Sequence, residues 1–125
     1  MRRSDAMYQA GVRQFNRGSL TAARAAFEEF ITAYPSEANV PRAYLYLADI
    51  LVQEEQLEDA IDAFVEITEL YPASDVVPDA LYRTGALYLE QGEADRARDY
   101  LERVVTSYPD SGAAILARQR LQEIG

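Results

Sequence analysis

The chain has 125 residues, of which 49% are hydrophobic and 26% charged, with 21 acidic and 12 basic side chains and a net charge of −9. This composition is too apolar for a disordered chain and is typical of one folded domain. The sequence has no cysteine and no histidine, and all twelve basic residues are arginine. These absences exclude disulfides, thiolate or imidazole chemistry and Schiff-base formation by lysine. We therefore expect a protein that is not an enzyme and that uses no metal or other cofactor.

The acidic excess also limits the class of partner. Binding to nucleic acid is driven by clustered basic residues, and in this chain the acids outnumber the bases. The longest apolar run, residues 43–48, is far shorter than the roughly 18 residues that cross a bilayer. We expect a protein or peptide partner, no nucleic acid and no insertion into a membrane. The isolated domain is expected to be a monomer or a weak homo-oligomer.

In chain order, the apolar residues follow a helical period. Tyr44, Leu47, Ala48 and Leu51, for example, stand at i, i+3, i+4 and i+7 and form one stripe. Breaks at glycine, proline and polar residues separate the stripes. The pattern predicts seven helices, at about 4–17, 20–34, 38–54, 57–71, 75–91, 94–108 and 111–124.

The helices belong to an internal repeat. Tyr-Pro occurs at residues 34–35, 71–72 and 108–109, and the same shift of 37 residues aligns Ala23, Ala60 and Ala97. Each unit is a pair of helices that ends where proline cannot continue the second helix. The turn within a pair contains Gly18 or Gly92, and Glu55 stands at the equivalent position in the middle unit. Because that position favours a left-handed conformation, we expect some backbone strain at Glu55.

These residues match a known pattern, an aromatic-x2-Leu-Gly-x2-Tyr segment followed by Ala-x3-Phe and Pro. The middle unit supplies Tyr44, Leu47, Ala48, Leu51, Ala60, Phe64 and Pro72. The sequence therefore resembles the tetratricopeptide repeat family, although its period is 37 residues rather than the usual 34 or so. The resemblance implies one all-α domain over residues 1–125, a right-handed α-solenoid. Its parts are repeats at about 4–37, 38–74 and 75–111 and a capping helix at 111–124, whose outer face is expected to be polar.

Within that family, the run from Tyr71 to Tyr82 is most similar to bacterial envelope proteins. The closest likeness is to the C-terminal repeat domain of the Tol-Pal system accessory protein, followed by the outer-membrane assembly lipoprotein of the BAM complex. This resemblance implies a periplasmic module, part of a longer precursor, that takes part in cell division. The chain is then either a domain of such a protein or part of a different protein with the same repeat, in which case a cytoplasmic location is the alternative.

In a solenoid of helix pairs, the first helices line the concave face, so their residues outside the packing stripe are candidates for ligand contact. Most of these candidates are apolar or aromatic, which indicates a peptide groove, but any one of them is equally well explained as core. Tyr8 and Val12 also replace the Lys and Asn of carboxylate-clamp repeat proteins, so a clamp is not expected. The candidates are Tyr8, Val12, Phe15, Arg42, Leu45, Asp49, Val52, Tyr82, Arg83, Ala86 and Leu89.

A second candidate surface is acidic. No basic residue stands between Arg42 and Arg83, and acids gather on the second helix of the middle unit, at Glu58, Asp59, Asp62, Glu66 and Glu69. They form either a solvated helix face or a docking surface for a basic partner. Their spacing lacks the glycine-containing loop of a calcium site. The main hypothesis is a groove that binds a protein segment, and the alternative is a scaffold that assembles through its convex face or the ends of the stack.

Overall fold

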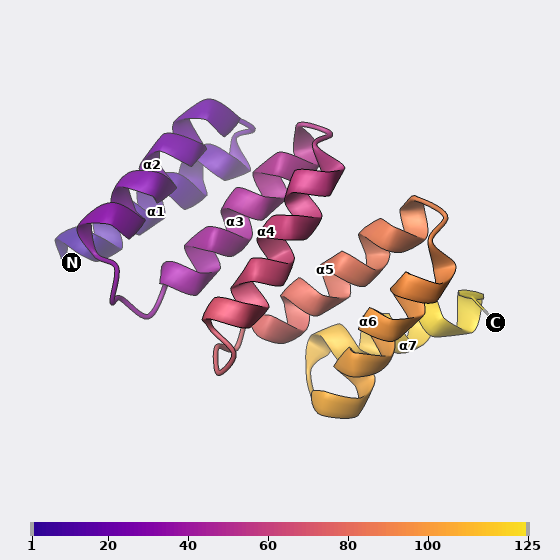
Figure 1. The fold of residues 1–125 in the computed structure, drawn as a ribbon. Coiled ribbons are helices and arrows are strands. Elements are labelled where there is room, and N and C mark those ends of the chain that lie inside the picture. The colour runs from indigo at the N-terminus through magenta and orange to yellow at the C-terminus, as the bar shows by residue number, and fades with distance from the viewer. Residues whose placement is uncertain (1, 125) are drawn as a thin grey trace. The chain divides into compact units, whose positions relative to one another are not determined.

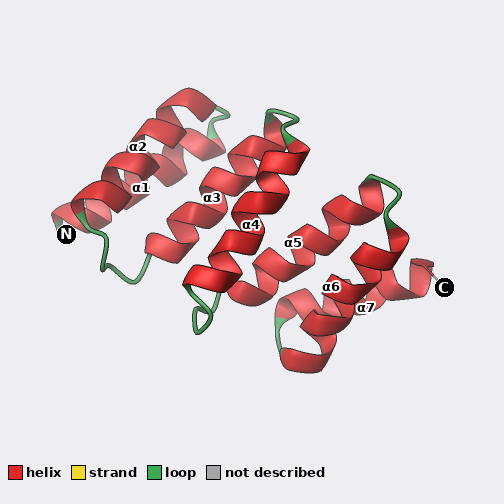
Figure 2. Ribbon diagram, viewed as in Figure 1, coloured by secondary structure: helices red, strands yellow, loops and turns green. Residues whose placement is uncertain are grey.

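The computed structural model describes residues 2–124, and all regular structure in that part of the chain is helical (Figures 1 and 2). The helices confirm the seven predicted elements, and most bounds agree within one residue. Two helices, α3 and α5, begin two residues later than predicted because residues 38–39 and 75–76 form turns. The helices are α1 (Arg3–Asn16), α2 (Leu20–Ala33), α3 (Val40–Gln53), α4 (Leu57–Leu70), α5 (Val77–Glu90), α6 (Ala94–Ser107) and α7 (Gly112–Ile124).

The chain forms two compact units whose boundary lies within α4, between Ala63 and Phe64. The first unit contains α1, α2, α3 and the N-terminal half of α4, and the second contains the remainder of α4 with α5, α6 and α7. Within the first unit α2 packs against both α1 and α3, and within the second α6 packs against both α5 and α7. Within each unit, these consecutive helices are therefore neighbours in space, as expected for helix pairs.

The turn that joins the two helices of a pair has the same conformation in all three repeats. Gly18 and Gly92 have φ values of 78° and 80°, and Glu55 has a φ of 62°. This is the left-handed region, which glycine enters freely and which a residue with a Cβ enters at a cost. The predicted strain at Glu55 is therefore confirmed.

The core of the first unit is built around aromatic side chains of α2. Phe27 and Phe30 are buried with Ala23 between neighbouring helices. The small residue at position 11 is required here, since a Cβ added to Gly11 would lie 2.7 Å from Cε1 of Phe27. The small residue on the first helix thus lets the backbone of α1 approach the ring directly.

On α6 of the second unit, Leu101 and Val104 stand where α2 has Phe27 and Phe30. Gly85 plays the role of Gly11, because an added Cβ would lie 2.9 Å from the side chain of Leu101. The buried hydroxyl of Thr84 donates to the carbonyl of Ala80 at 2.8 Å, so this polar group is satisfied within α5. The core cluster comprises Val77, Leu81, Leu101, Val104, Ala113, Ala114 and Ala117.

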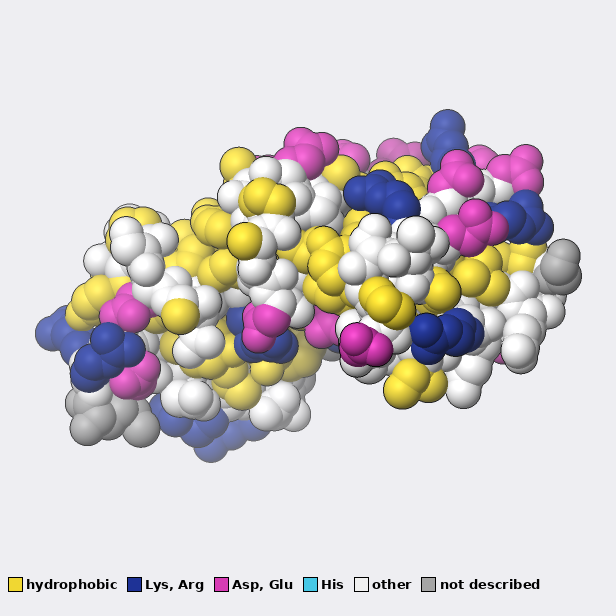
Figure 3. Space-filling view, turned by 90° about the horizontal axis from the view of Figure 1, so that it is seen from below, with side chains coloured by type: hydrophobic (Ala, Val, Ile, Leu, Met, Phe, Trp, Pro, Cys, Tyr) yellow, Lys and Arg dark blue, Asp and Glu magenta, His cyan; other side chains and the backbone are white. Residues whose placement is uncertain are grey.

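Two features of the surface bear on function. The outer face of α7 is less polar than expected, since Ile115 and Leu116 are 58% and 45% exposed. On the face drawn in Figure 3, hydrophobic side chains reach the surface between acidic and basic ones. Among residues 2–124, no helix combines the length and the hydropathy that crossing a bilayer requires.

Candidate binding surfaces

An aromatic cluster joins α1, α2 and α3 in the first unit. The ring of Tyr46 stacks on Phe27, with centroids 4.9 Å apart and planes at 11°, and receives Phe15 edge-on at 5.0 Å. Tyr8 lies 5.5 Å from Phe30 and 6.3 Å from Tyr46 between ring centroids. Such ring pairs stabilise the cluster beyond the area that they bury and hold each ring in a fixed orientation. Phe15 and Tyr46 remain partly exposed.

Tyr8 is the buried member of this cluster. Burial raises the pKa of its phenol to about 12, the neighbouring Tyr46 adds to the increase, and the charge of Arg42 opposes it. Tyr8 is 6% exposed, and Leu45 on α3 is 5% exposed. Both were predicted to contact a ligand, and in the structure both present little surface to one.

The other predicted residues of the first unit are partly exposed. Val12 and Phe15 stand on α1, and Arg42, Asp49 and Val52 stand on α3. Arg42 and Asp49 both interact with other groups of the chain, so neither is an isolated charge. These five side chains offer a mixed apolar and charged surface, and their contact with a ligand remains a prediction.

In the second unit, the predicted residues on α5 are all partly exposed. Tyr82, Arg83, Ala86 and Leu89 share this helix. Arg120 of α7 donates from Nε to the hydroxyl of Tyr82 at 3.4 Å, and this hydrogen bond raises the pKa of Arg120. The hydrogen bond orients Tyr82 and leaves its ring beside a guanidinium group.

Sequence reasoning missed two residues of these surfaces, Tyr46 and Arg120. Both occupy the repeat position of Arg83, since residues 46, 83 and 120 are separated by 37. Arg83 itself was predicted, and its guanidinium carbon lies 6.0 Å from the ring centroid of Phe64. The repeat shift applied to Arg83 would therefore have identified both residues.

The acidic surface lies along α4. Glu58, Asp59, Asp62, Glu66 and Glu69 are all exposed, and none forms an ion pair within the described part of the chain. Over the same residues, no group of acidic side chains is arranged to hold a metal ion. The structure thus presents these carboxylates to solvent without assigning them a partner.

Comparison with known proteins identifies the family to which this architecture belongs. A family model described as tetratricopeptide repeat (TPR) matches residues 8–75, more than half of the chain, and a second with the same description matches residues 79–111. No curated protein matches the sequence.

Among solved structures, the chain is similar to MamA (22% identity, 86% of this chain and 59% of that one, TM-score 0.66). It is also similar to YrrB, described as a TPR protein with an unusual peptide-binding site (22% identity, 95% and 58% covered, TM-score 0.69). A third similar structure is the TPR domain of Arabidopsis OM64 (16% identity, 96% and 94% covered, TM-score 0.73). The chain spans about three-fifths of MamA and YrrB, and at these identities the likeness shows the fold alone.

The family indicates which class of function these surfaces serve. Tetratricopeptide repeats are typically non-catalytic interaction modules. The 37-residue shift, the helix pairs with their shared turn and the family-model match lead to one conclusion. The chain belongs to the tetratricopeptide repeat family, whose domains generally mediate protein–protein interactions.

Proposed function

We propose that this protein binds a segment of another protein through the first helices of its repeats. The observation that carries the proposal is the set of partly exposed apolar and aromatic side chains on these helices, with Phe15 and Tyr46 in the first unit and Tyr82 and Leu89 in the second. Solvent-exposed apolar patches of this kind are typical of binding sites. The peptide-binding description of YrrB, a protein of the same fold, supports the proposal.

The rigidity of the aromatic residues favours binding. Tyr46 is held by stacking on Phe27, and Tyr82 is held by the hydrogen bond from Arg120. Side chains that are fixed before binding lose little conformational entropy when a ligand covers them. The exposed parts of these aromatic side chains favour a ligand segment with apolar side chains.

A more specific assignment rests on the resemblance of residues 71–82 to the envelope branch of the family. On that basis we propose a periplasmic domain of a bacterial cell-envelope protein, with a role in coordinating the Tol-Pal system during division. Binding to purified periplasmic domains of the Tol-Pal proteins tests this assignment. If those domains do not bind while selected peptides do, the envelope role fails and the binding function stands.

The general proposal is tested with peptides selected from a random library on the wild-type chain. We expect Phe15→Ala and Tyr82→Ala to weaken binding by about tenfold or more, as truncation of an aromatic anchor does. Tyr100→Ala is the matched control for Tyr82→Ala, because both rings pack at the edge of the same core cluster but stand on different helices. Tyr34→Ala is the control for Phe15→Ala. The proposal fails if no peptide is selected, or if the anchor variants bind as tightly as their controls.

One observation favours the alternative, a scaffold that assembles through the ends of the stack. Ile115 and Leu116 are exposed on α7, where an apolar side chain gains by being covered. A scaffold function of this kind requires self-association, which peptide binding does not.

A further inference from the structure

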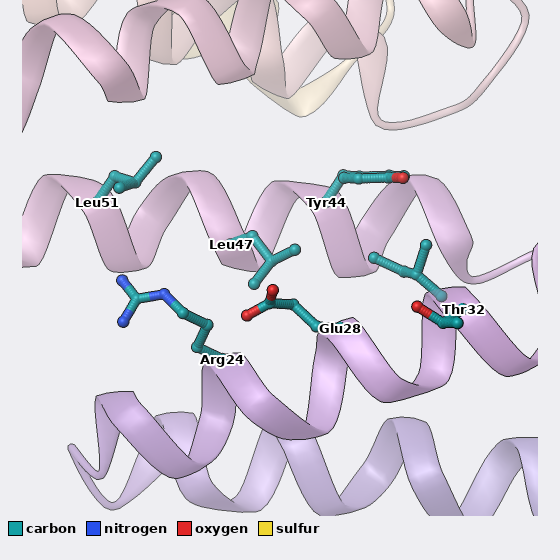
Figure 4. Close-up of a pocket in the computed structure, with 7 residues that line it drawn as sticks. Arg24, Glu28, Thr32, Tyr44, Leu47 and Leu51 are labelled. Carbon is teal, nitrogen blue, oxygen red and sulfur yellow. The ribbon is translucent and has the colours of Figure 1, made fainter.

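An open pocket of about 400 Å³ lies between α2 and α3 of the first unit. In Figure 4, side chains from both helices extend into the space between them. We call its apolar lining residues, Ile31, Leu47 and Leu51, the floor, and its charged and hydroxyl-bearing residues the rim. The pocket contains none of the residues predicted to bind a peptide. Its lining residues are Arg24, Glu28, Ile31, Thr32, Tyr44, Leu47 and Leu51.

The corresponding region of the second unit differs, because the pocket of about 380 Å³ there is lined by polar residues of α6 alone and by no residue of α7. A shift of 74 residues takes α2 and α3 to α6 and α7, which are in closer contact with each other than α2 and α3 are. Ile31 and Leu47 become Val105 and Leu121, and both of these pack against the core cluster. The apolar residues that line the pocket in the first unit are therefore packed into the core at the equivalent positions of the second, and an apolar floor is specific to the first unit.

The charges at the rim of the pocket indicate which side chains a binding partner would need there. Arg24 forms an ion pair with Glu54, so its charge is already balanced. Glu28 is exposed and forms no ion pair with any described residue. A complementary surface would bring aliphatic side chains to the floor and a basic group to Glu28.

The same chain presents such a surface on α7. Ile115 and Leu116 are exposed, and Arg118 follows Ile115 by three residues, which places the two side chains on one side of the helix. Arg118 is exposed, and Nη2 donates to the carbonyl of Pro109 at 3.1 Å. A guanidinium group has five N–H donors, so further donors are available for a carboxylate.

We propose that α7 of one copy docks into the α2–α3 pocket of a second copy, with Ile115 against the apolar floor and Arg118 paired with Glu28. The two surfaces differ, so the contact is head-to-tail and each copy can bind one neighbour at each surface. A contact of this size is expected to be weak, with self-association that rises with concentration and falls with salt. This inference goes beyond peptide binding and does not depend on it.

Charge reversal on exposed residues tests the contact without disturbing the core. We expect E28R and R118E each to weaken self-association by at least about fivefold, because a favourable charge pair becomes a repulsive one. E102R is the matched control, since Glu102 is the exposed equivalent of Glu28 on α6, and it should associate like the wild type. Sedimentation equilibrium measures the average mass as a function of concentration, relative to the 14.0 kDa of the monomer. Circular dichroism checks that each variant is folded.

The decisive measurement is an equimolar mixture of E28R and R118E. Each variant repels itself, but α7 of either variant meets a pocket of opposite charge on the other, so the mixture should regain wild-type association. The double variant E28R/R118E should regain it as well. The proposal is overturned if the wild type stays monomeric up to about millimolar concentration. It is also overturned if E28R and E102R behave alike, or if the mixture associates no better than its components.

Discussion

The middle turn offers a direct test of how the repeat shapes the backbone. Glu55 follows α3 with a φ of 62°, and its amide donates to the carbonyl of Val52 at 2.9 Å. The amide of Gln56 donates to the carbonyl of Leu51, also at 2.9 Å. This pair of bonds is the Schellman motif, which usually has glycine at the left-handed position. The perturbation is Glu55→Gly, which keeps both hydrogen bonds and removes the Cβ.

The expected gain follows from two opposing contributions. A residue with a Cβ loses roughly 1–2 kcal/mol in the left-handed region relative to its favoured conformation. Glycine avoids this loss but has more conformational freedom in the unfolded chain, which costs roughly 0.5–1 kcal/mol. The side chain of Glu55 is exposed, so little packing is removed. We expect Glu55→Gly to raise the free energy of unfolding by about 0.5–1 kcal/mol and the melting temperature by about 3 °C.

Chemical denaturation monitored by circular dichroism measures the change. Glu55→Ala is the control, because it removes the charge and keeps the Cβ, so it should not reproduce the gain. Gly92→Ala makes the reverse change at the equivalent position. An added Cβ there would meet no atom within 4 Å, so only backbone strain is introduced, and the substitution should destabilise the protein by about 1 kcal/mol. Equal stability of the Gly and Ala variants at position 55 would refute the assignment of strain to the backbone.

Two further predictions concern the core of the first unit. Gly11→Ala should destabilise the protein by about 1–3 kcal/mol in the same assay, since the new methyl group displaces the ring of Phe27. Gly112→Ala is the control and should be close to neutral, because the added Cβ meets open space. Tyr8 should keep its proton until a pH of about 12, against an ordinary pKa of 10.0. The neutral phenol is thus favoured in the folded state, so up to about 2–3 kcal/mol of stability is present below pH 10 and is lost as the pH rises from about 10 to 12. Tyr8→Phe should remove this part of the alkaline loss, and an unchanged pH profile would contradict the burial of the phenol.

The helices and their repeat are predictable from sequence because they depend on local chemistry. Proline at residues 35, 72 and 109 ends the second helices, and the 37-residue shift identifies equivalent positions without any knowledge of tertiary contacts. The same shift predicts the strained turn at Glu55, since Gly18 and Gly92 reveal the conformation that the position requires.

Exposure within the candidate site is harder to predict, as the equivalent residues Tyr8, Leu45 and Tyr82 show. The first two are buried and Tyr82 is partly exposed, although all three occupy one repeat position. A repeat position fixes the direction of a side chain but not the identity of the groups that cover it. For this reason we expect Tyr8→Ala and Leu45→Ala to change mainly stability, and Tyr82→Ala is the better test of the proposed binding.

The residue 38 positions later explains the difference between the two tyrosines. Tyr8 is followed at that interval by Tyr46, whose ring meets it edge-on at 6.3 Å between centroids as part of the aromatic cluster. Tyr82 is followed by Arg120, which donates a hydrogen bond to the hydroxyl and leaves the ring partly exposed. The two tyrosines thus differ in their neighbour on the next first helix, which is an aromatic ring for the buried one and a guanidinium group for the partly exposed one. A single repeat geometry in this way gives the first unit an aromatic cluster and the second unit a tyrosine beside a guanidinium group.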